Sequence, residues 1–389
     1  MPIADRLLLI CAMVFAFALP VAAQDAAPAT ATASTLPPEL QAELDALQSG
    51  AWRPTIQARA SVGWRNNVLL SPFAPIERAF GRGELEAMLW QPMRDRFEFL
   101  SFLNGDVLRY FSPPAETGGE QQWSLHLEER WRAADALRVS LKATGYLNDM
   151  VIDLSETEAT RVVAPTTVRG AYLAAVTRFT LPAGFTFEPI GRIKRTDYRE
   201  FAGDYDEGMV GARLDWRRGQ SLISAAVFET QRRYATRVQY TAGGRALPGT
   251  RLRFQQRVGE LKAGTGWKGG GDWDIAATVG RLENRDQASG YFDYDQDRAR
   301  LEVGWARAAW RVTLDAETKR MEYLVQTVGA GIAPPPRIAD DHDVSLRLQR
   351  EFNERWTIFA EHRWERSRSN EAEFSYRANT ALAGVQRSF

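Results

Sequence analysis

The residues of this 389-residue chain that could do chemistry are charged side chains at every second position of its C-terminal part. In the segments 298–302, 311–319, 347–351 and 361–365 they alternate with mostly apolar residues. Successive side chains of a β-strand point to opposite faces, so this spacing places the charges on one face. Rings of charged side chains that line a pore select ions and polar solutes electrostatically. The candidate pore-lining residues are Arg298, Arg300, Glu302, Arg311, Asp315, Glu317, Lys319, Arg347, Glu351, Glu361, Arg363 and Glu365.

The same charges also have a structural interpretation. Opposite charges on neighbouring strands pair across the hydrogen-bonded ladder and stabilise it. Such pairs could keep a barrel wall round or fill its interior. The pattern leaves a charged channel and a salt-bridged wall as open alternatives.

Catalytic chemistry has little support in the sequence. The three histidines are His126, His342 and His362, and no serine stands in a Gly-x-Ser-x-Gly or lipase-like context. A Ser–His pair with an orienting group is therefore not recognisable. An acid–histidine arrangement occurs at 340–343, which we interpret as a solvated loop rim. No histidine or cysteine cluster has metal-ligand spacing, so we expect no enzyme, no cofactor and no metal centre.

One acidic run resembles the start of a calcium-binding loop. Asp293, Asp295 and Asp297 have the spacing of the first ligands, but Arg298 stands where the loop requires glycine. We expect a hydrated loop edge. Weak binding of divalent ions, bridging lipopolysaccharide phosphates, is the alternative.

The elements that must position the charged residues are β-strands. From residue 52 onward, apolar and polar residues alternate in segments of about ten residues, as in Ile56, Ala58, Ala60, Val62 and Trp64. A soluble β-sandwich alternates in the same way, but its strands average about five or six residues. A tilted strand that crosses a membrane needs about 9–11 residues. Tryptophans at the ends of the apolar stripes, Trp90 among them, also fit a membrane interface.

The connections between these segments alternate in length. Short turns are predicted at 91–96, 133–136, 182–184, 218–221, 269–272, 306–309 and 353–355. Long loops are predicted near 66–81, 112–120, 150–167, 200–206, 236–250, 285–291, 326–341 and 368–374. Tight periplasmic turns and long extracellular loops are typical of outer-membrane barrels. The sequence therefore predicts an all-β fold, a transmembrane antiparallel up-and-down β-barrel of sixteen strands over residues 52–389, with 14 or 18 strands as alternatives because boundaries shift by about 2–4 residues.

The N-terminal part has two predicted segments before the barrel. Residues 1–23 have the positive start, apolar core and small cleavage-site residues of a signal peptide. Residues 24–51 form a periplasmic leader, with a short helix at 38–48 that begins after proline and ends before Gly50. The helix could enter the barrel mouth as a plug or belong to a loose leader.

Composition supports a wet interior with an apolar exterior. Lys+Arg and Asp+Glu are equal at 49 each, which argues against a nucleic-acid binder. The 12 Trp, 19 Phe and 11 Tyr suit a barrel with aromatic girdles and a polar interior. After the predicted signal peptide, no segment has 18 consecutive apolar residues, so we expect the membrane to be crossed by strands.

On these features the chain resembles a bacterial outer-membrane β-barrel of porin size. Gly384 and Phe389 match the C-terminal insertion signal that the barrel-assembly machinery reads, while Arg387 departs from it. Residues 60–72 are similar to the opening of β-barrel porins, among them porins encoded beside exopolysaccharide synthesis genes. The resemblance implies a location in the bacterial outer membrane, with outer-membrane lipid, lipopolysaccharide and the assembly machinery as partners. A homo-oligomer is an open alternative.

The function expected from the sequence is a porin-like channel for passive passage of small polar solutes or oligosaccharides. The alternative is a non-conducting structural barrel, for example an accessory to exopolysaccharide export. An outer-membrane hydrolase is least favoured, for want of a nucleophile–base pair.

Overall fold

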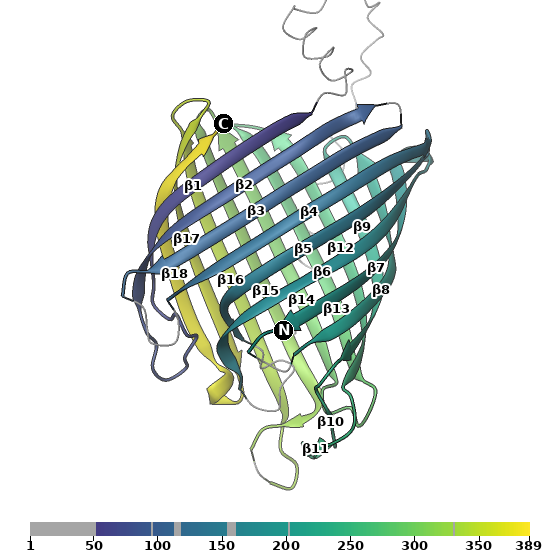
Figure 1. The fold of residues 1–389 in the computed structure, drawn as a ribbon, viewed down its shortest axis with the longest axis vertical. Coiled ribbons are helices and arrows are strands. Elements are labelled where there is room, and N and C mark those ends of the chain that lie inside the picture. Colours follow the sequence, from purple (N-terminus) through teal and green to yellow (C-terminus); the bar gives the residue numbers. More distant parts are fainter. Residues whose placement is uncertain (1–51, 95, 113–117, 154–160, 201–202, 330) are drawn as a thin grey trace, which may run out of the picture.

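In the computed structural model the chain forms a closed barrel of tilted strands (Figure 1). The structure describes residues 52–389 except 95, 113–117, 154–160, 201–202 and 330. The predicted signal peptide at 1–23 and the predicted leader at 24–51, with its helix at 38–48, lie outside the described residues. No helix among the described residues is long and apolar enough to cross a membrane.

Sixteen antiparallel strands make up the barrel, and β1 closes it by pairing with β18. The predicted all-β fold and strand number are therefore confirmed. A separate two-stranded sheet, β10 (Gln239–Tyr240) and β11 (Ala246–Leu247), lies between β9 and β12 in the sequence. The short 3₁₀ segments are η2 (Pro182–Gly184) and η3 (Ala372–Phe374). The barrel strands are β1 (Arg53–Arg65), β2 (Arg78–Arg94), β3 (Phe97–Tyr110), β4 (Gly119–Ala134), β5 (Leu137–Asp153), β6 (Val163–Thr180), β7 (Phe185–Tyr198), β8 (Tyr205–Arg218), β9 (Ser221–Tyr234), β12 (Arg253–Lys268), β13 (Asp272–Asp286), β14 (Tyr294–Arg307), β15 (Trp310–Thr327), β16 (Pro336–Glu351), β17 (Trp356–Ser369) and β18 (Tyr376–Ser388).

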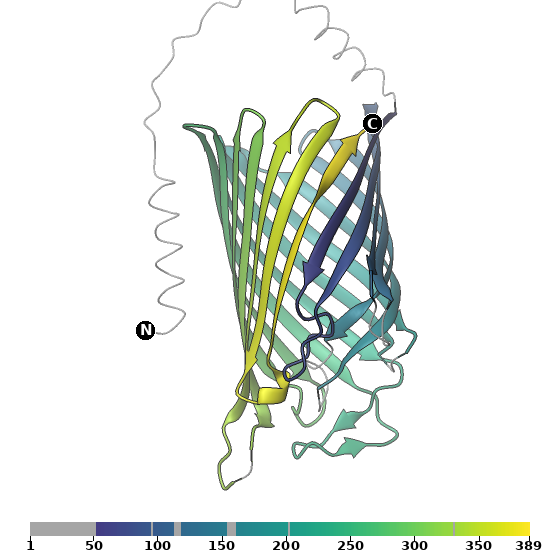
Figure 2. The ribbon, with the colours of Figure 1, turned by 90° about the vertical axis from the view of Figure 1, so that its left-hand side faces the viewer.

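Tight turns and long loops lie at opposite ends of the barrel. Figure 2 shows the C-terminus at the tight-turn end, and β10 and β11 at the other end. The barrel strands have 13 to 18 residues, more than the roughly 9–11 that cross the hydrocarbon. The strands therefore extend beyond the hydrocarbon layer.

The tight turns depend on residues that tolerate a left-handed backbone. In the β6–β7 turn, Ala183 and Gly184 have φ values of 57° and 82°. A Cβ atom at Gly184 would lie 2.3 Å from the carbonyl oxygen of Arg217, so glycine is required there. In the β16–β17 turn, the side-chain oxygen of Asn353 accepts hydrogen bonds from the N–H groups of Arg355 and Trp356, both at 2.9 Å.

The outward face carries exposed apolar side chains, and on β13 it changes from apolar to charged toward the loop end. Val62, Ile193 and Val210 are more than 60% exposed, which is expected where lipid covers them. At the tight-turn end, the rings of Trp267 and Trp273 stack with centroids 5.7 Å apart, and Trp305 lies 6.2 Å farther on. Amphipathic rings favour the headgroup level of a membrane. On β13, the outward residues from the turn to the loop end are Trp273, Ile275, Ala277, Val279, Arg281, Glu283 and Arg285.

Two kinds of local prediction were wrong. The loops expected at 150–167 and 326–341 are shorter, because β5 reaches Asp153 and β6 begins at Val163, while β15 reaches Thr327 and β16 begins at Pro336. The segment 340–343 therefore lies in a strand and not on a loop rim. In this segment β15 and β16 extend beyond the hydrocarbon layer of the membrane. Charged side chains therefore occur within the hydrogen-bonded strands and do not mark where the strands end. Trp90 is the second correction: its indole N–H donates to Glu98 at 2.9 Å on the inner face, so Trp90 is not part of the outer aromatic girdle.

Candidate functional site

The charged residues of β14 and β15 form a ladder of ion pairs on the inner face. The guanidinium of Arg298 lies 2.5 Å from the carboxylate of Glu317, which also contacts Lys319 at 3.4 Å. Arg300 donates two hydrogen bonds to Asp315, at 2.6 and 3.0 Å. The Nη2 atom of Arg300 also lies 3.1 Å from Glu302. Strand alternation thus brings these predicted residues together as cross-strand pairs.

The ladder extends to neighbouring strands. Glu302 contacts Lys262 of β12 at 3.2 Å, and Arg298 contacts Glu260 of β12 at 3.7 Å. The sequence-based selection omitted both β12 residues. Alternation predicts that both residues lie on the polar face of β12. It does not predict the registers of β12 with β13 and of β13 with β14, which place them beside the β14 residues.

A second group of ion pairs lies on β16 and β17. Arg347 and Glu361 are register partners and lie 3.5 Å apart. Arg363 pairs with Asp343 and contacts Glu365 at 3.2 Å. The sequence predicts a loop at Asp343, so its role as the partner of Arg363 was not predicted.

Barrel closure connects this second group to the first strands of the chain. Arg65 of β1 lies 3.5 Å from both Glu365 and Glu120. Farther along β1, Arg59 contacts Glu86 at 2.7 Å. The contact between Arg65 and Glu365 joins residues 300 positions apart. Only the closed ladder between β1 and β18 brings these two residues together.

Arg311 and Glu351 differ from the other candidates. Both are exposed near the tight-turn end, and neither forms an ion pair within the part of the chain that the structure describes. They lie at the start of β15 and the end of β16, so they belong to the mouth at the tight-turn end.

The inner face at the level of the first ladder is in contact with solvent. The side chains of Arg300 and Asp315 keep 36% and 34% of their surface exposed, and Glu302 and Lys319 keep 38% and 39%. A barrel filled by packed side chains would leave these groups almost fully buried. Water therefore reaches this part of the wall, and the ion pairs line a hydrated space.

The loop end of the barrel is different, because aromatic side chains pack there. Phe292, from the β13–β14 loop, is fully buried among Tyr234, Leu252 and Phe254. Arg237 lies over the rings of Tyr234 and Phe292, at 4.7 and 5.9 Å. This aromatic cluster holds the β9–β12 and β13–β14 loops against the wall.

A smaller cluster holds the first loop. Val68 is fully buried with Phe80, Tyr110, Phe359 and Leu382, which come from four different strands. The β1–β2 loop therefore folds back onto the barrel wall. The two clusters therefore hold the β1–β2, β9–β12 and β13–β14 loops in fixed positions on the barrel.

The histidines are dispersed over the described barrel. His126 lies on the inner face, with Nδ1 2.8 Å from the hydroxyl of Thr144. His342 of β16 points to the outer face, where Nδ1 lies 2.9 Å from the hydroxyl of Thr318. His362 lies on the outer face of β17 in register with Leu346. No group of three potential metal ligands occurs among the described residues, and the absence of enzymatic activity stays a prediction.

The three aspartates of the candidate calcium segment point in different directions. Asp293 accepts a hydrogen bond from the N–H of Asp286 at 2.6 Å within the turn. Burial raises the pKa of Asp293, and the nearby Asp286 carboxylate adds to the rise. Asp295 and Asp297 lie on the outer face of β14, and Arg281 contacts them at 2.7 and 3.8 Å. Their charges are already compensated by arginine.

The residues of the predicted insertion signal lie at the closure of the barrel. Gly384 faces Ser61 of β1, and a Cβ atom added to it would lie 2.3 Å from the carbonyl oxygen of Ala60. The N–H of Phe389 donates to the carbonyl oxygen of Ile56 at 2.9 Å. Gly384 therefore has a packing role at the β1–β18 seam, independent of any recognition by the assembly machinery.

We expect Gly384→Val to weaken this seam. The added side chain must displace the β1 backbone, at a cost of about 1–3 kcal/mol or more. The measurement is the urea midpoint of the purified barrel in detergent, where no assembly machinery is present. Gly83→Val on β2 is the matched control, because a Cβ atom there meets nothing within 4 Å. Equal midpoints for the two variants would contradict the packing role.

The closed ladder, the exposed apolar outer face and the tryptophan girdle together decide the class of protein. The chain is an outer-membrane β-barrel. A closed barrel satisfies every backbone hydrogen bond in hydrocarbon, where an open sheet cannot. The charged residues predicted from alternation then lie on the wall of the enclosed space.

Comparison with known proteins adds likenesses of fold. No protein-family profile and no curated protein sequence matches this chain. The solved structures with similar folds include an anion-selective porin from Comamonas acidovorans, with 10% identity and a TM-score of 0.49 over 87% of this chain and 99% of that one. Pseudomonas aeruginosa OccK2 (OpdF) in complex with glucuronate has 9% identity and a TM-score of 0.47 over 87% and 98%. A bacterial polysaccharide outer membrane secretin has 10% identity and a TM-score of 0.41 over 86% and 97%. Because each TM-score is below 0.5, the architecture of this chain rests on its own strand register.

Proposed function

We propose that this barrel is a porin-like channel for the passive passage of small polar solutes or oligosaccharides. The observation that carries the proposal is the solvent exposure of the ion pairs on the inner face of β14 and β15. Side chains that fill a barrel are packed, whereas these keep about a third of their surface in contact with water. Sixteen strands are enough to leave an aqueous channel.

The inner face favours polar solutes of no strong net charge. Arginine and carboxylate groups lie side by side on the wall, as in the ion pairs of Arg298 and Arg300 on β14 with Glu317 and Asp315 on β15. Such a wall presents both donors and acceptors to a passing solute. Hydroxyl groups of sugars can use both, which supports oligosaccharides as one solute class.

The second candidate function is a non-conducting structural or accessory barrel. The aromatic cluster around Phe292 favours it, because tightly held loops reduce the opening at the loop end. The two functions differ in one property, the flow of ions. Single-channel recording of the full barrel in a planar bilayer separates them: steady openings support the channel, and silence supports the accessory barrel.

Cysteine scanning makes this test specific to the inner face. The one native cysteine, Cys11, lies in the predicted signal peptide, so an introduced thiol would be the only one after cleavage. Glu302 and Leu301 are neighbours on opposite faces of β14. We expect a charged, water-soluble thiosulfonate reagent to reduce the current through Glu302→Cys and leave Leu301→Cys unchanged. Equal responses of the two variants would contradict a conducting path along this wall.

A further inference from the structure

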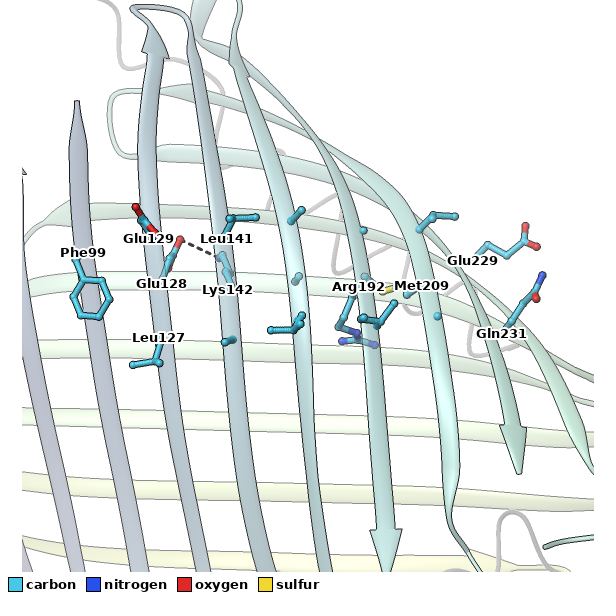
Figure 3. Close-up of a pocket in the computed structure, with 18 residues that line it drawn as sticks. Phe99, Leu127, Glu128, Glu129, Leu141, Lys142, Arg192, Met209, Glu229 and Gln231 are labelled. Atoms are coloured by element: carbon cyan, nitrogen blue, oxygen red, sulfur yellow. Dashed lines mark ion pairs between the residues drawn. The ribbon is translucent and has the colours of Figure 1, made fainter. Parts of the chain in front are cut away.

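An oblique groove runs across the outer face of the barrel. It crosses β3 to β9 and has a volume of about 870 Å³. Figure 3 shows its lining residues in a row from Phe99 on β3 to Gln231 on β9. The apolar side chains that line it are Phe99, Leu127, Leu141, Leu173, Ile193 and Val210. The groove starts near the tight-turn end, where Phe99 lies close to the start of β3, and runs to the loop end of β9.

Small outward residues create this groove. Gly191 of β7 and Gly208 of β8 lie on its floor, and a Cβ atom added to either meets nothing within 4 Å. The missing side chains therefore leave real space on the outer face. In a membrane, such a lipid-facing space must be filled by an acyl chain or by another protein.

Exposed arginines lie at the end of the groove nearest the long loops. A second hollow shares Gly208 and Gln231 with the groove and is also lined by Arg195 and Arg233. A third shares Val210 and Glu229 with it and is lined by Arg257 and Arg281. Arg257 is two-thirds exposed, and its ion pair with Glu229 is loose at 4.0 Å. An apolar groove that ends among arginines is complementary to an amphiphile with an anionic headgroup.

An unfavourable pair of like charges marks the same end. Arg233 of β9 and Arg253 of β12 are direct register partners on the outer face. Like charges directly opposite each other destabilise a sheet. Asp206 flanks Arg233 on β8, but it also contacts Arg195 at 3.9 Å. Among the described residues, Arg253 has no ion pair, so an anion from outside the chain would compensate it.

We propose that this groove and its arginines bind a phosphorylated glycolipid of the outer leaflet, of the lipid A type. The acyl chains lie in the groove, in contact with its floor at Gly191 and Gly208. The phosphates lie between Arg233, Arg253 and Arg257. The arginines are at the loop end, which is the outward side of the membrane if the tight turns are periplasmic. That is the leaflet in which such glycolipids occur. This site is on the outer face and does not depend on whether the barrel conducts.

Lipid binding to the full-length barrel in detergent tests the proposal. Native mass spectrometry with bisphosphorylated lipid A, monophosphorylated lipid A and phosphatidylglycerol measures affinity for each. We expect the bisphosphorylated form to bind most tightly, and Arg233→Glu with Arg253→Glu to weaken it by about tenfold, since at least one charge-assisted hydrogen bond is lost. Gly208→Leu should weaken all three lipids by filling the groove. Gly83→Leu, on the outer face of β2, is the control and should bind as the unchanged protein does.

Three outcomes would overturn the proposal. The first is unchanged lipid A affinity in both the charge variant and Gly208→Leu. The second is that phosphatidylglycerol binds as tightly as lipid A and that the arginine substitutions change neither affinity. The third is efficient disulfide cross-linking between copies that carry Gly208→Cys, which would show that a second copy of the chain occupies the groove. Heat-modifiable migration in gels confirms that each variant is folded.

The single variant Arg253→Glu separates a binding role from a purely structural one. It converts the like-charge pair with Arg233 into an ion pair, so the thermal midpoint in detergent should not fall. Under the proposal, lipid A affinity falls in the same variant. A higher midpoint with unchanged affinity would assign these arginines no part in lipid binding.

Discussion

Replacing Arg298 and Arg300 by glutamate shifts the reversal potential of the channel toward cation selectivity. Both arginines lie on the inner face, and the reversal leaves Asp315 without its arginine partner and Glu317 with Lys319 alone. Two unit charges 4 Å apart interact by about 1 kcal/mol in bulk water, equivalent to about a fivefold change in local ion occupancy. We therefore expect the ratio of cation to anion permeability to rise by about that factor. Reversal potentials across a salt gradient in planar bilayers measure it.

A matched pair of arginines on the outer face controls for the change in net charge. Arg366 and Arg377 are register partners on β17 and β18, on the lipid-facing side. Their replacement by glutamate changes the net charge equally and should leave the reversal potential unchanged. The neutral variant Arg298→Gln with Arg300→Gln should give about half the shift, because it changes half the charge. Unchanged selectivity in a conducting glutamate variant would remove the β14–β15 ladder from the selectivity mechanism.

Truncating Phe292 to alanine releases the loops at the loop end of the barrel. Phe292 is fully buried, its ring centroid lies 5.3 Å from that of Tyr240, and its N–H donates to Asp286 at 2.9 Å. A buried Phe→Ala change costs about 3–5 kcal/mol. This cost falls on the packing of the loops, because the barrel ladder does not include Phe292. A loss of about 3 kcal/mol raises the population of the opened loop by more than about 100-fold.

Limited trypsin digestion measures this opening at Arg245, an exposed residue between β10 and β11. We expect cleavage there to accelerate while the barrel keeps its folded mobility in gels. Phe73→Ala is the control, since Phe73 is 77% exposed in the β1–β2 loop and belongs to no buried cluster. Equal cleavage of the two variants would contradict the anchoring role of Phe292. Larger single-channel noise in Phe292→Ala is a second expected sign of mobile loops.

Several site residues were readable from the sequence because alternation assigns each strand residue to a face. Arg298, Glu317 and Arg363 lie on the inner face, as their spacing predicts. Asp343 was missed because a charged run was interpreted as a loop. Charged residues do not mark the strand ends in this protein. The strands extend beyond the hydrocarbon layer, and their charged side chains there contact water or form ion pairs with each other.

The lipid-facing groove was not readable from the sequence. Gly191 and Gly208 cannot be told from other strand glycines in the sequence, and their effect depends on their diagonal positions in the register of β7 and β8, where Gly191 faces Val210 and Gly208 faces Ile193. The pairing of Arg233 with Arg253 is likewise a matter of register, since the β9–β12 loop lies between them. Sequence spacing carries no information about which residue lies opposite across a long loop.

The alternation of apolar and polar residues by itself determined the class of fold and the face of most strand side chains, because a strand repeats every two residues. The alternating lengths of the connections predicted sixteen strands, with 14 and 18 as alternatives. Only the tertiary structure decided which charges meet. Arg65 reaches Glu365 because β1 and β18 close the ladder in one register. It also decided that the loops fold onto the wall, because Val68 and Phe292 find buried apolar partners contributed by several strands and loops. Those contacts depend on chain closure over long distances, which local sequence does not encode.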